Sequence, residues 1–186
     1  MSKVLVIGAS GATGKLVVSE LLQQNINVVS IVRSTSTFVN AMGNHPNYHE
    51  VLANIDDLSA QELAFHLNDC HVVISCLGHN LTFKGMFVEP RRLVTDTIKK
   101  VTHAIGLRES GDKTKIILMN TTGNSNRDIP EKPPLSQRMV ISILRVLLPP
   151  HVDNEQAADF LRTKIAPDHQ QIEWVAVRPD SLTNES

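Results

Sequence analysis

The chain has 186 residues, of which 41% are hydrophobic and 20% are charged, and its formal net charge is −1. This length fits one domain over residues 1–186 with a substantial core. The small net charge gives no support for binding nucleic acid or an anionic membrane surface, and no apolar run is long enough to cross a bilayer. Cys70 and Cys76 lack metal-ligand spacing, so no metal site is predicted. Because the first apolar run begins right after the N-terminus, there is no room for a signal peptide, and we expect a cytoplasmic protein.

Six apolar runs, several of them rich in β-branched residues, predict strands that alternate with helices. An uninterrupted apolar run is typical of a strand that is buried on both faces of a parallel sheet. The predicted strands cover residues 4–7, 28–32, 48–52, 71–76, 115–119 and 173–177. The alternation predicts an α/β protein with a doubly wound, mostly parallel sheet (a Rossmann fold) and helices on both faces.

Helical patterns lie between these strands, and two of them carry a start signal. Ser59 with Glu62, and Asp153 with Gln156, have the spacing of a capping box, so we expect helices to begin at Ser59 and Asp153. The apolar stripe of the helix before the fifth strand is formed by every third or fourth residue. The predicted helices cover residues 17–22, 59–67, 90–107 and 153–165.

Two further segments do not fit a minimal sheet. Residues 124–134 are polar and proline-rich, which predicts a surface loop. Residues 138–148 are apolar almost all round, which predicts a helix that is buried in its own chain, lines a pocket or meets a partner subunit. The last of these alternatives would make the protein a homodimer.

Three glycines at a spacing of three, Gly8, Gly11 and Gly14, connect the first strand to the first helix. The first would let the chain turn, the second would let a diphosphate approach the backbone, and the third would let the helix pack closely on the sheet. The positive end of the helix and its unpaired N–H groups would then bind phosphates. An ordinary tight turn is the alternative. The predicted cofactor-binding residues of this turn are Gly8, Ser10, Gly11, Ala12, Thr13 and Gly14.

A nucleoside-triphosphate loop does not fit the same segment. The first glycine of that motif would fall on Ala9, and Leu16 takes the position of the metal-binding serine or threonine. A dinucleotide is therefore the better interpretation.

The residues after the second strand predict which dinucleotide is bound. An NAD-specific site usually has an acidic residue here that binds the ribose 2′-hydroxyl, whereas the guanidinium of Arg33 can bind a 2′-phosphate with two donors. Arg33, with Ser34 beside it, predicts NADP(H) rather than NAD. A solvated surface arginine is the alternative.

In a doubly wound sheet the ligand lies outside the carboxyl ends of the strands. After the third strand, Asn54 could bond the exocyclic amine of adenine while Ile55 packs on the ring, although this segment could equally be a loop leading to the next helix. After the fourth strand come Cys76, Leu77 and Gly78, and the glycine would allow the ribose and nicotinamide to approach the backbone.

The candidate catalytic residues follow the predicted fifth strand and precede the predicted helix at 153–165. The hydroxyls of Thr121 and Thr122 could hold a substrate oxygen, or they could only satisfy backbone groups. His151 is a candidate general acid, because the pKa of histidine suits that role. Arg178 closes the sixth strand at the same edge and is a further candidate for the cofactor.

These segments resemble the atypical short-chain dehydrogenase/reductases, an NAD(P)-binding Rossmann family, and among them the flavin reductase/biliverdin-IXβ reductase-like and NmrA-like proteins. The matching segments are VIGASGATG (residues 6–14), VR (32–33), ISCLG (74–78) and VAVRP (175–179). The resemblance implies NADPH as the cofactor and the reduction of a small-molecule hydride acceptor, such as a flavin, a quinone or a similar conjugated compound.

The chain departs from that resemblance in two ways. The wider superfamily protonates its substrate through a Tyr-x-x-x-Lys pair, but the single tyrosine here is Tyr48, at the start of the third strand. Relatives usually continue past Arg178-Pro179, so the usual C-terminal substrate-side extension is expected to be absent or truncated.

The sequence leaves three functions to consider. A flavin-like acceptor can take its proton from solvent or a nearby weak acid, so a reductase without a Tyr/Lys pair is the preferred hypothesis. The alternative is a non-enzymatic, NADP-binding redox sensor of the NmrA-like kind. A sugar-nucleotide epimerase fits less well, because it would need the missing tyrosine.

Overall fold

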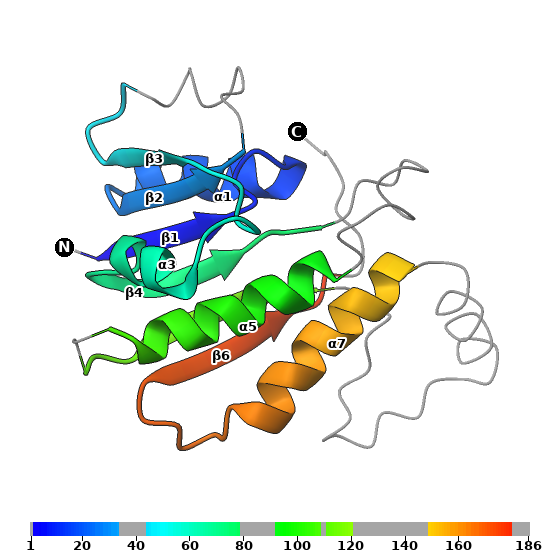
Figure 1. The fold of residues 1–186 in the computed structure, drawn as a ribbon. Coiled ribbons are helices and arrows are strands. Elements are labelled where there is room, and N and C mark those ends of the chain that lie inside the picture. Colours follow the sequence, from blue (N-terminus) through cyan, green and yellow to red (C-terminus); the bar gives the residue numbers. More distant parts are fainter. Residues whose placement is uncertain (1, 34–43, 79–91, 109–110, 121–148, 180–186) are drawn as a thin grey trace.

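The structure is a computed structural model of the chain, and it describes residues 2–33, 44–78, 92–108, 111–120 and 149–179. These residues build one six-stranded sheet in which every neighbouring pair is parallel (Figure 1). The strand order is β3-β2-β1-β4-β5-β6. The strands are β1 (Lys3–Ile7), β2 (Asn27–Val32), β3 (Tyr48–Leu52), β4 (Cys70–Ser75), β5 (Thr114–Met119) and β6 (Ile172–Val177).

The described helices are distributed over both faces of the sheet, as predicted. In Figure 1, α1 lies behind the sheet, and α3, α5 and α7 lie in front of it. Their bounds are α1 (Ala12–Gln23), α3 (Ala60–His66), α5 (Leu93–Gly106) and α7 (Pro149–Lys164). The predicted doubly wound α/β fold is therefore confirmed, and the predicted strands agree with the structure to within one residue at each end.

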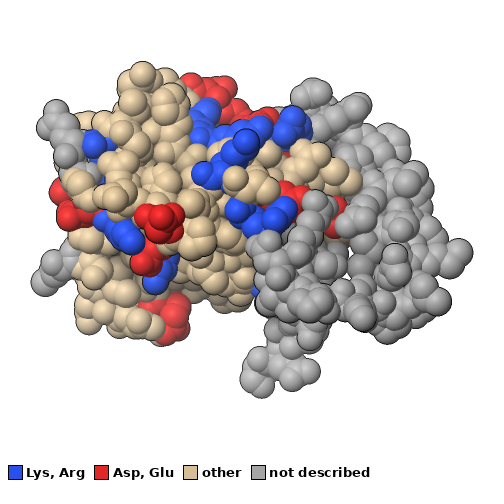
Figure 2. Space-filling view, turned by 90° about the horizontal axis from the view of Figure 1, so that it is seen from below, with Lys and Arg blue, Asp and Glu red and all other residues tan. Residues whose placement is uncertain are grey.

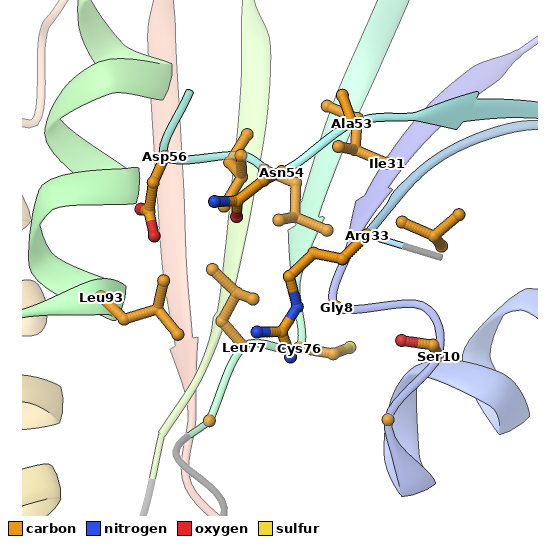
Figure 3. Close-up of a pocket in the computed structure, with 15 residues that line it drawn as sticks. Gly8, Ser10, Ile31, Arg33, Ala53, Asn54, Asp56, Cys76, Leu77 and Leu93 are labelled. Carbon is orange, nitrogen blue, oxygen red and sulfur yellow. The ribbon is translucent and has the colours of Figure 1, made fainter. Parts of the chain in front are cut away.

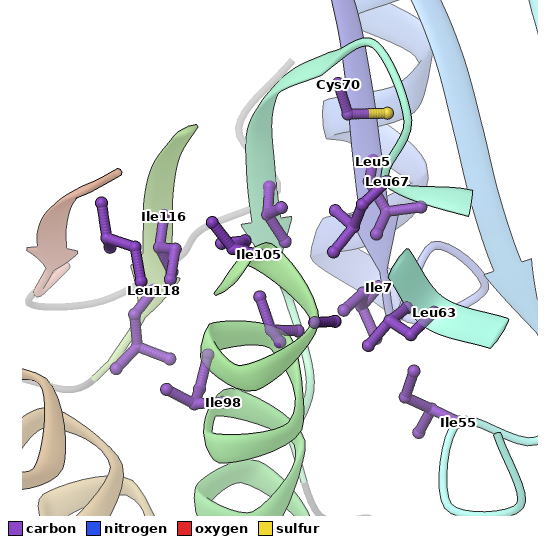
Figure 4. Packing of buried hydrophobic residues seen from close by; sticks show 14 of the residues in the cluster. Leu5, Ile7, Ile55, Leu63, Leu67, Cys70, Ile98, Ile105, Ile116 and Leu118 are labelled. Carbon is purple, nitrogen blue, oxygen red and sulfur yellow. The ribbon is translucent and has the colours of Figure 1, made fainter. Parts of the chain in front are cut away.

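Strand β1 is buried on both of its faces, which explains its uninterrupted apolar sequence. Val4 and Val6 belong to a cluster that packs against α1. Leu5 and Ile7 belong to the larger cluster on the opposite face, which packs against α3, α5 and α7 (Figure 4). The predicted stripe of α5 is buried in this cluster, with zero exposure at Val94, Ile98, Val101 and Ile105.

The two predicted capping boxes have different outcomes. At α3 the prediction is confirmed: the Glu62 N–H donates to Ser59 Oγ over 3.2 Å, and the Ser59 N–H donates to Glu62 Oε2 over 2.8 Å. At α7 it is wrong, because the helix begins at Pro149 and Asp153 lies inside it.

The side chain of Asp153 instead caps a different helix. Its carboxylate, in a residue that is only 2% exposed, accepts hydrogen bonds from the N–H groups of Val94 (2.8 Å) and Thr95 (3.0 Å). The Thr95 hydroxyl in turn donates to the carbonyl oxygen of Asp153 over 2.9 Å. Asp153 thereby joins α7 to the amino end of α5, which begins at Leu93 rather than at the predicted residue 90.

The described part of the surface mixes both signs of charge, and Figure 2 shows basic and acidic side chains interspersed on one face. Its ion pairs include Lys115–Glu173 at 3.4 Å, and both side chains of that pair are half exposed, so it contributes little stability. Among the described helices, none combines the length and the apolar character that a bilayer span requires. The predicted loop at 124–134 and the predicted helix at 138–148 lie outside the described residues.

Candidate functional site

The order of the strands reverses between β1 and β4, and this is where a doubly wound sheet binds ligands. Strand β1 pairs with β2 on one side and with β4 on the other. A cavity of about 370 Å³ opens at this point, within the size range of small-molecule sites (Figure 3). It is lined by Ile7, Gly8, Ser10, Gly11, Ile31, Val32, Arg33, Ala53, Asn54, Ile55, Asp56, Cys76, Leu77, Gly78 and Leu93.

The turn after β1 requires glycine at two positions. Gly8 has a φ of +80°, in the left-handed region, and a Cβ there would lie 2.8 Å from the carbonyl carbon and oxygen of Cys76. A Cβ on Gly14 would overlap the carbonyl oxygen of Gly8 and come within 2.8 Å of the Cα of Ala9. The turn is therefore pressed between the end of β4 and the first turn of α1, as close helix–sheet packing demands.

Of the helices α1, α3 and α5, only α1 has an amino end that no side chain among the described residues caps. Its N-cap is Gly11, which has no side chain to cap the helix, and no acidic residue lies in the first turn. The amino end of α3 is capped by Ser59 and Glu62, and that of α5 by Asp153. The first-turn N–H groups of a helix have no partner within the helix, and its dipole favours negative charge. A bound phosphate would satisfy both features of α1.

Arg33 supplies a positive charge to the same cavity. It follows β2 directly, and Figure 3 shows its guanidinium turned toward the middle of the cavity. Within the described part of the chain, no residue forms a hydrogen bond or an ion pair with it. Ser34, the other residue predicted for this position, lies outside the described residues.

The loop after β3 forms the opposite wall of the cavity. Asn54 points its amide toward the cavity in Figure 3. Ile55 also lines the cavity, but it is only 5% exposed and belongs to the main apolar cluster, so little of its side chain is accessible to a base. The predicted contacts of these two residues with adenine stay predictions.

The end of β4 forms the floor between these two walls. The Cys76 N–H donates to the carbonyl oxygen of Ile7 over 2.9 Å, which continues the β1–β4 pairing as far as the cavity. Burial raises the pKa of the Cys76 thiol to about 11. The sulfur is therefore protonated at neutral pH and is a poor nucleophile. Leu77 and Gly78 follow it along the cavity wall.

Four predicted cofactor-binding residues that the structure describes are not among those that line this cavity: Ala12, Thr13, Gly14 and Arg178. Ala12 and Thr13 lie in the first turn of α1, next to it. Arg178 follows β6, and both β4 and β5 lie between that strand and β1. Thr121 and Thr122 lie outside the described residues.

His151 lies in the first turns of α7 and is paired with a carboxylate. Its Nε2 is 3.5 Å from Oε1 of Glu155, and the two side chains are 9% and 8% exposed. Nearby, Asn120 at the end of β5 donates through Nδ2 to the carbonyl oxygen of Asn154 over 3.1 Å. The His151–Glu155 pair therefore lies toward the carboxyl edge of the sheet, but neither residue is among those that line the cavity. The tyrosine is far from both, because Tyr48 begins β3 at the amino edge.

Six residues of the wall were not among the predicted site residues: Ile7, Ile31, Val32, Ala53, Asp56 and Leu93. The first three end the predicted strands β1 and β2. Ala53 and Asp56 flank Asn54 in the sequence, so their position after β3 was a usable signal. Leu93 begins α5, and its own sequence context gives no such signal.

The comparisons with known proteins agree with this geometry. A family model described as NAD(P)H-binding matches residues 8–186. This match confirms the predicted resemblance to NAD(P)-binding Rossmann proteins. No curated protein is similar enough in sequence to count as a match.

Solved structures share the fold at low sequence identity. Gre2 from Candida albicans, in a complex with NADPH, has a TM-score of 0.69 and 16% identity, over 97% of this chain and 58% of that one. Yeast methylglyoxal/isovaleraldehyde reductase Gre2, complexed with NADPH, gives a TM-score of 0.65 and 17% identity, over 96% and 57%. A candidate NADH-flavin reductase from Streptococcus pneumoniae gives a TM-score of 0.59 and 19% identity, over 95% and 71%. The chain thus spans less than two thirds of the length of the Gre2 proteins.

Proposed function

The chain belongs to the NAD(P)H-binding family, and from this premise we propose that it is an oxidoreductase that uses NADP(H) to reduce a conjugated small-molecule acceptor, such as a flavin or a quinone. One observation carries the proposal. The uncapped amino end of α1, with its two obligatory glycines, opens into the cavity at the strand switch point. The Gre2 structures, which were solved with NADPH, support the choice of NADP(H) as the cofactor. The Streptococcus pneumoniae protein, named as a candidate NADH-flavin reductase, supports the choice of a flavin as the acceptor.

The residues of the cavity fit a dinucleotide in three parts. The turn from Gly8 to Gly14 leaves room for a diphosphate against the first-turn N–H groups of α1. Arg33 would bind the 2′-phosphate, and Asn54 would bind the edge of the adenine. When bound, the cofactor would supply a hydride to the acceptor.

The remaining requirement of such a reduction is a proton. Cys76 is a poor source at neutral pH, since burial raises its thiol pKa to about 11. His151, the general acid predicted from the sequence, lies 3.5 Å from Glu155 through its Nε2 and is not among the residues that line the cavity. Solvent is the alternative donor for a flavin-like acceptor.

Replacement of Arg33 tests the choice of NADP(H). Arg33→Ala should weaken NADPH binding by about one to two decades, because a charge-assisted hydrogen bond contributes roughly 1.5–3 kcal/mol. NADH binding should change little, since NADH has no 2′-phosphate. Arg162→Ala is the matched control, because Arg162 lies on α7 and pairs with Asp159. Isothermal titration of the wild type and both variants with both nucleotides measures the six affinities. Equal losses of NADPH and NADH binding in Arg33→Ala would count against the role of Arg33.

A cofactor-binding redox sensor is the second candidate function. It is favoured by the position of Tyr48, the only tyrosine in the chain, which is buried at the amino edge of the sheet and cannot serve the cavity. NADPH oxidation with a panel of flavins and quinones separates the two functions. Turnover above background supports the reductase, and tight NADPH binding with no oxidation by any acceptor supports the sensor.

A further inference from the structure

One lysine of α5 binds the loop after β3, which forms one wall of the cavity. Lys100 Nζ donates to the carbonyl oxygen of Ile55 over 2.9 Å and to that of Asp56 over 2.8 Å. Both acceptors belong to residues that line the cavity, whereas Lys100 itself does not line it. The lysine therefore touches the wall from behind.

The backbone of this loop explains why it needs such a donor. The Ala53 N–H continues the β2–β3 ladder by donating to the Val32 carbonyl oxygen over 2.9 Å, and the Asp57 N–H donates to the Asn54 carbonyl oxygen over 3.0 Å. Between these two bonds, the carbonyl groups of Ile55 and Asp56 converge on Lys100. The Asn54 side chain is left facing the cavity (Figure 3).

An ammonium group suits these two acceptors. It has three donors and no acceptor, and its hydrogen bonds are charge-assisted and therefore stronger than neutral ones. The neighbouring Lys99 differs in its contacts, because its Nζ lies 3.6 Å from Oδ1 of Asp96 and 6.0 Å from the centre of the Phe160 ring. Only the second of these adjacent lysines reaches the cavity wall.

We propose that Lys100 is a positioning residue for the adenosine half of the cofactor, an inference that rests on the proposed function. It acts through the backbone of the loop, whose shape it fixes so that the amide of Asn54 faces the base. Its loss lets the loop move, and a ligand that carries adenine must then order the loop on binding. A ligand without adenine gains nothing from Lys100.

The test compares Lys100→Met with the matched control Lys99→Met by isothermal titration of NADPH and of 2′,5′-ADP. We expect Lys100→Met to weaken both ligands by about tenfold, which corresponds to about 1.4 kcal/mol. Lys99→Met should bind both as the wild type does. Lys100→Arg should restore most of the affinity, because its guanidinium can also donate to two carbonyl groups. Lys100→Gln keeps an N–H donor but removes the charge, so it should weaken both ligands by no more than Lys100→Met does.

A double-mutant cycle with Asn54→Ala distinguishes positioning from general support of the fold. If Lys100 acts through Asn54, the double variant should lose clearly less affinity than the sum of the single losses. Losses that add in full, or a Lys100→Met variant that binds both ligands within twofold of the wild type, overturn the inference. Wild-type protein that does not bind NADPH would instead refute the proposed function.

Discussion

The hydrogen bonds that Asp153 of α7 accepts from the amino end of α5 should contribute strongly to stability. Asp153→Ala removes the acceptor of two backbone N–H groups whose residues, Val94 and Thr95, are 0% and 1% exposed. A buried donor that loses its partner costs about 1–3 kcal/mol, and replacement of a helix cap by alanine typically costs about 0.5–2 kcal/mol. We therefore expect the free energy of unfolding to fall by about 3 kcal/mol, a large part of the roughly 5–15 kcal/mol of a typical domain.

Two further variants make this prediction quantitative. Asp153→Asn keeps the shape and one acceptor oxygen, but its amide group faces the second N–H, so about half of the loss is expected. Asp159→Ala is the control on the same helix. Its carboxylate pairs with Arg162 at 3.3 Å, and these side chains are 31% and 27% exposed, so loss of this pair should cost less than about 1 kcal/mol. Urea unfolding followed by circular dichroism measures all three. An alanine variant at 153 that is no less stable than the one at 159 would refute the reasoning.

Two other predictions concern the cavity. Gly14→Ala should destabilise the protein by about 1–3 kcal/mol and weaken NADPH binding, because the new Cβ would overlap the Gly8 carbonyl oxygen. Gly106→Ala is the control and should not destabilise the protein, because a Cβ there meets no atom within 4 Å. Equal unfolding midpoints of the two variants in urea would contradict this prediction. The thiol of Cys76, with a pKa raised by burial from 9.0 to about 11, should react with iodoacetamide about 100-fold more slowly at pH 8 than an unfolded thiol, and the rate should rise about tenfold per pH unit toward pH 10. Mass spectrometry reads the extent of alkylation at Cys76, and bound NADPH should slow it further. Fast alkylation of the native protein at pH 7 would contradict the raised pKa of this thiol.

The sequence was sufficient for features whose cause is local. A strand that is buried on both faces needs apolar side chains at every position, so its apolar run predicts it from the sequence, as Val4 to Ile7 illustrate. The order of the strands in the sheet does not follow from any single apolar run. The glycines of the first turn are visible for a similar reason, since a positive φ and close contact with β4 leave no room for a side chain at Gly8. The Ser59 capping box was predictable because both partners lie within four residues.

Contacts between distant segments were not predictable in this way. The Asp153 pattern looks like a cap of its own helix, yet its partners in α5 are 58 and 59 residues away. Lys100 is likewise 44 and 45 residues from its acceptors, and nothing in its local sequence separates it from Lys99. Leu93 lines the cavity only because the fold brings the start of α5 to the same edge as the β1 turn. In each case the tertiary fold, rather than a local pattern, decides what the side chain does.

The structure of the NADPH complex tests the central claim most directly. The account predicts that the diphosphate lies against the first-turn N–H groups of α1, between Gly8 and Gly14, with the 2′-phosphate within hydrogen-bonding distance of Arg33. A nucleotide bound at another helix, or a complex in which the turn after β1 contacts no phosphate, would contradict it.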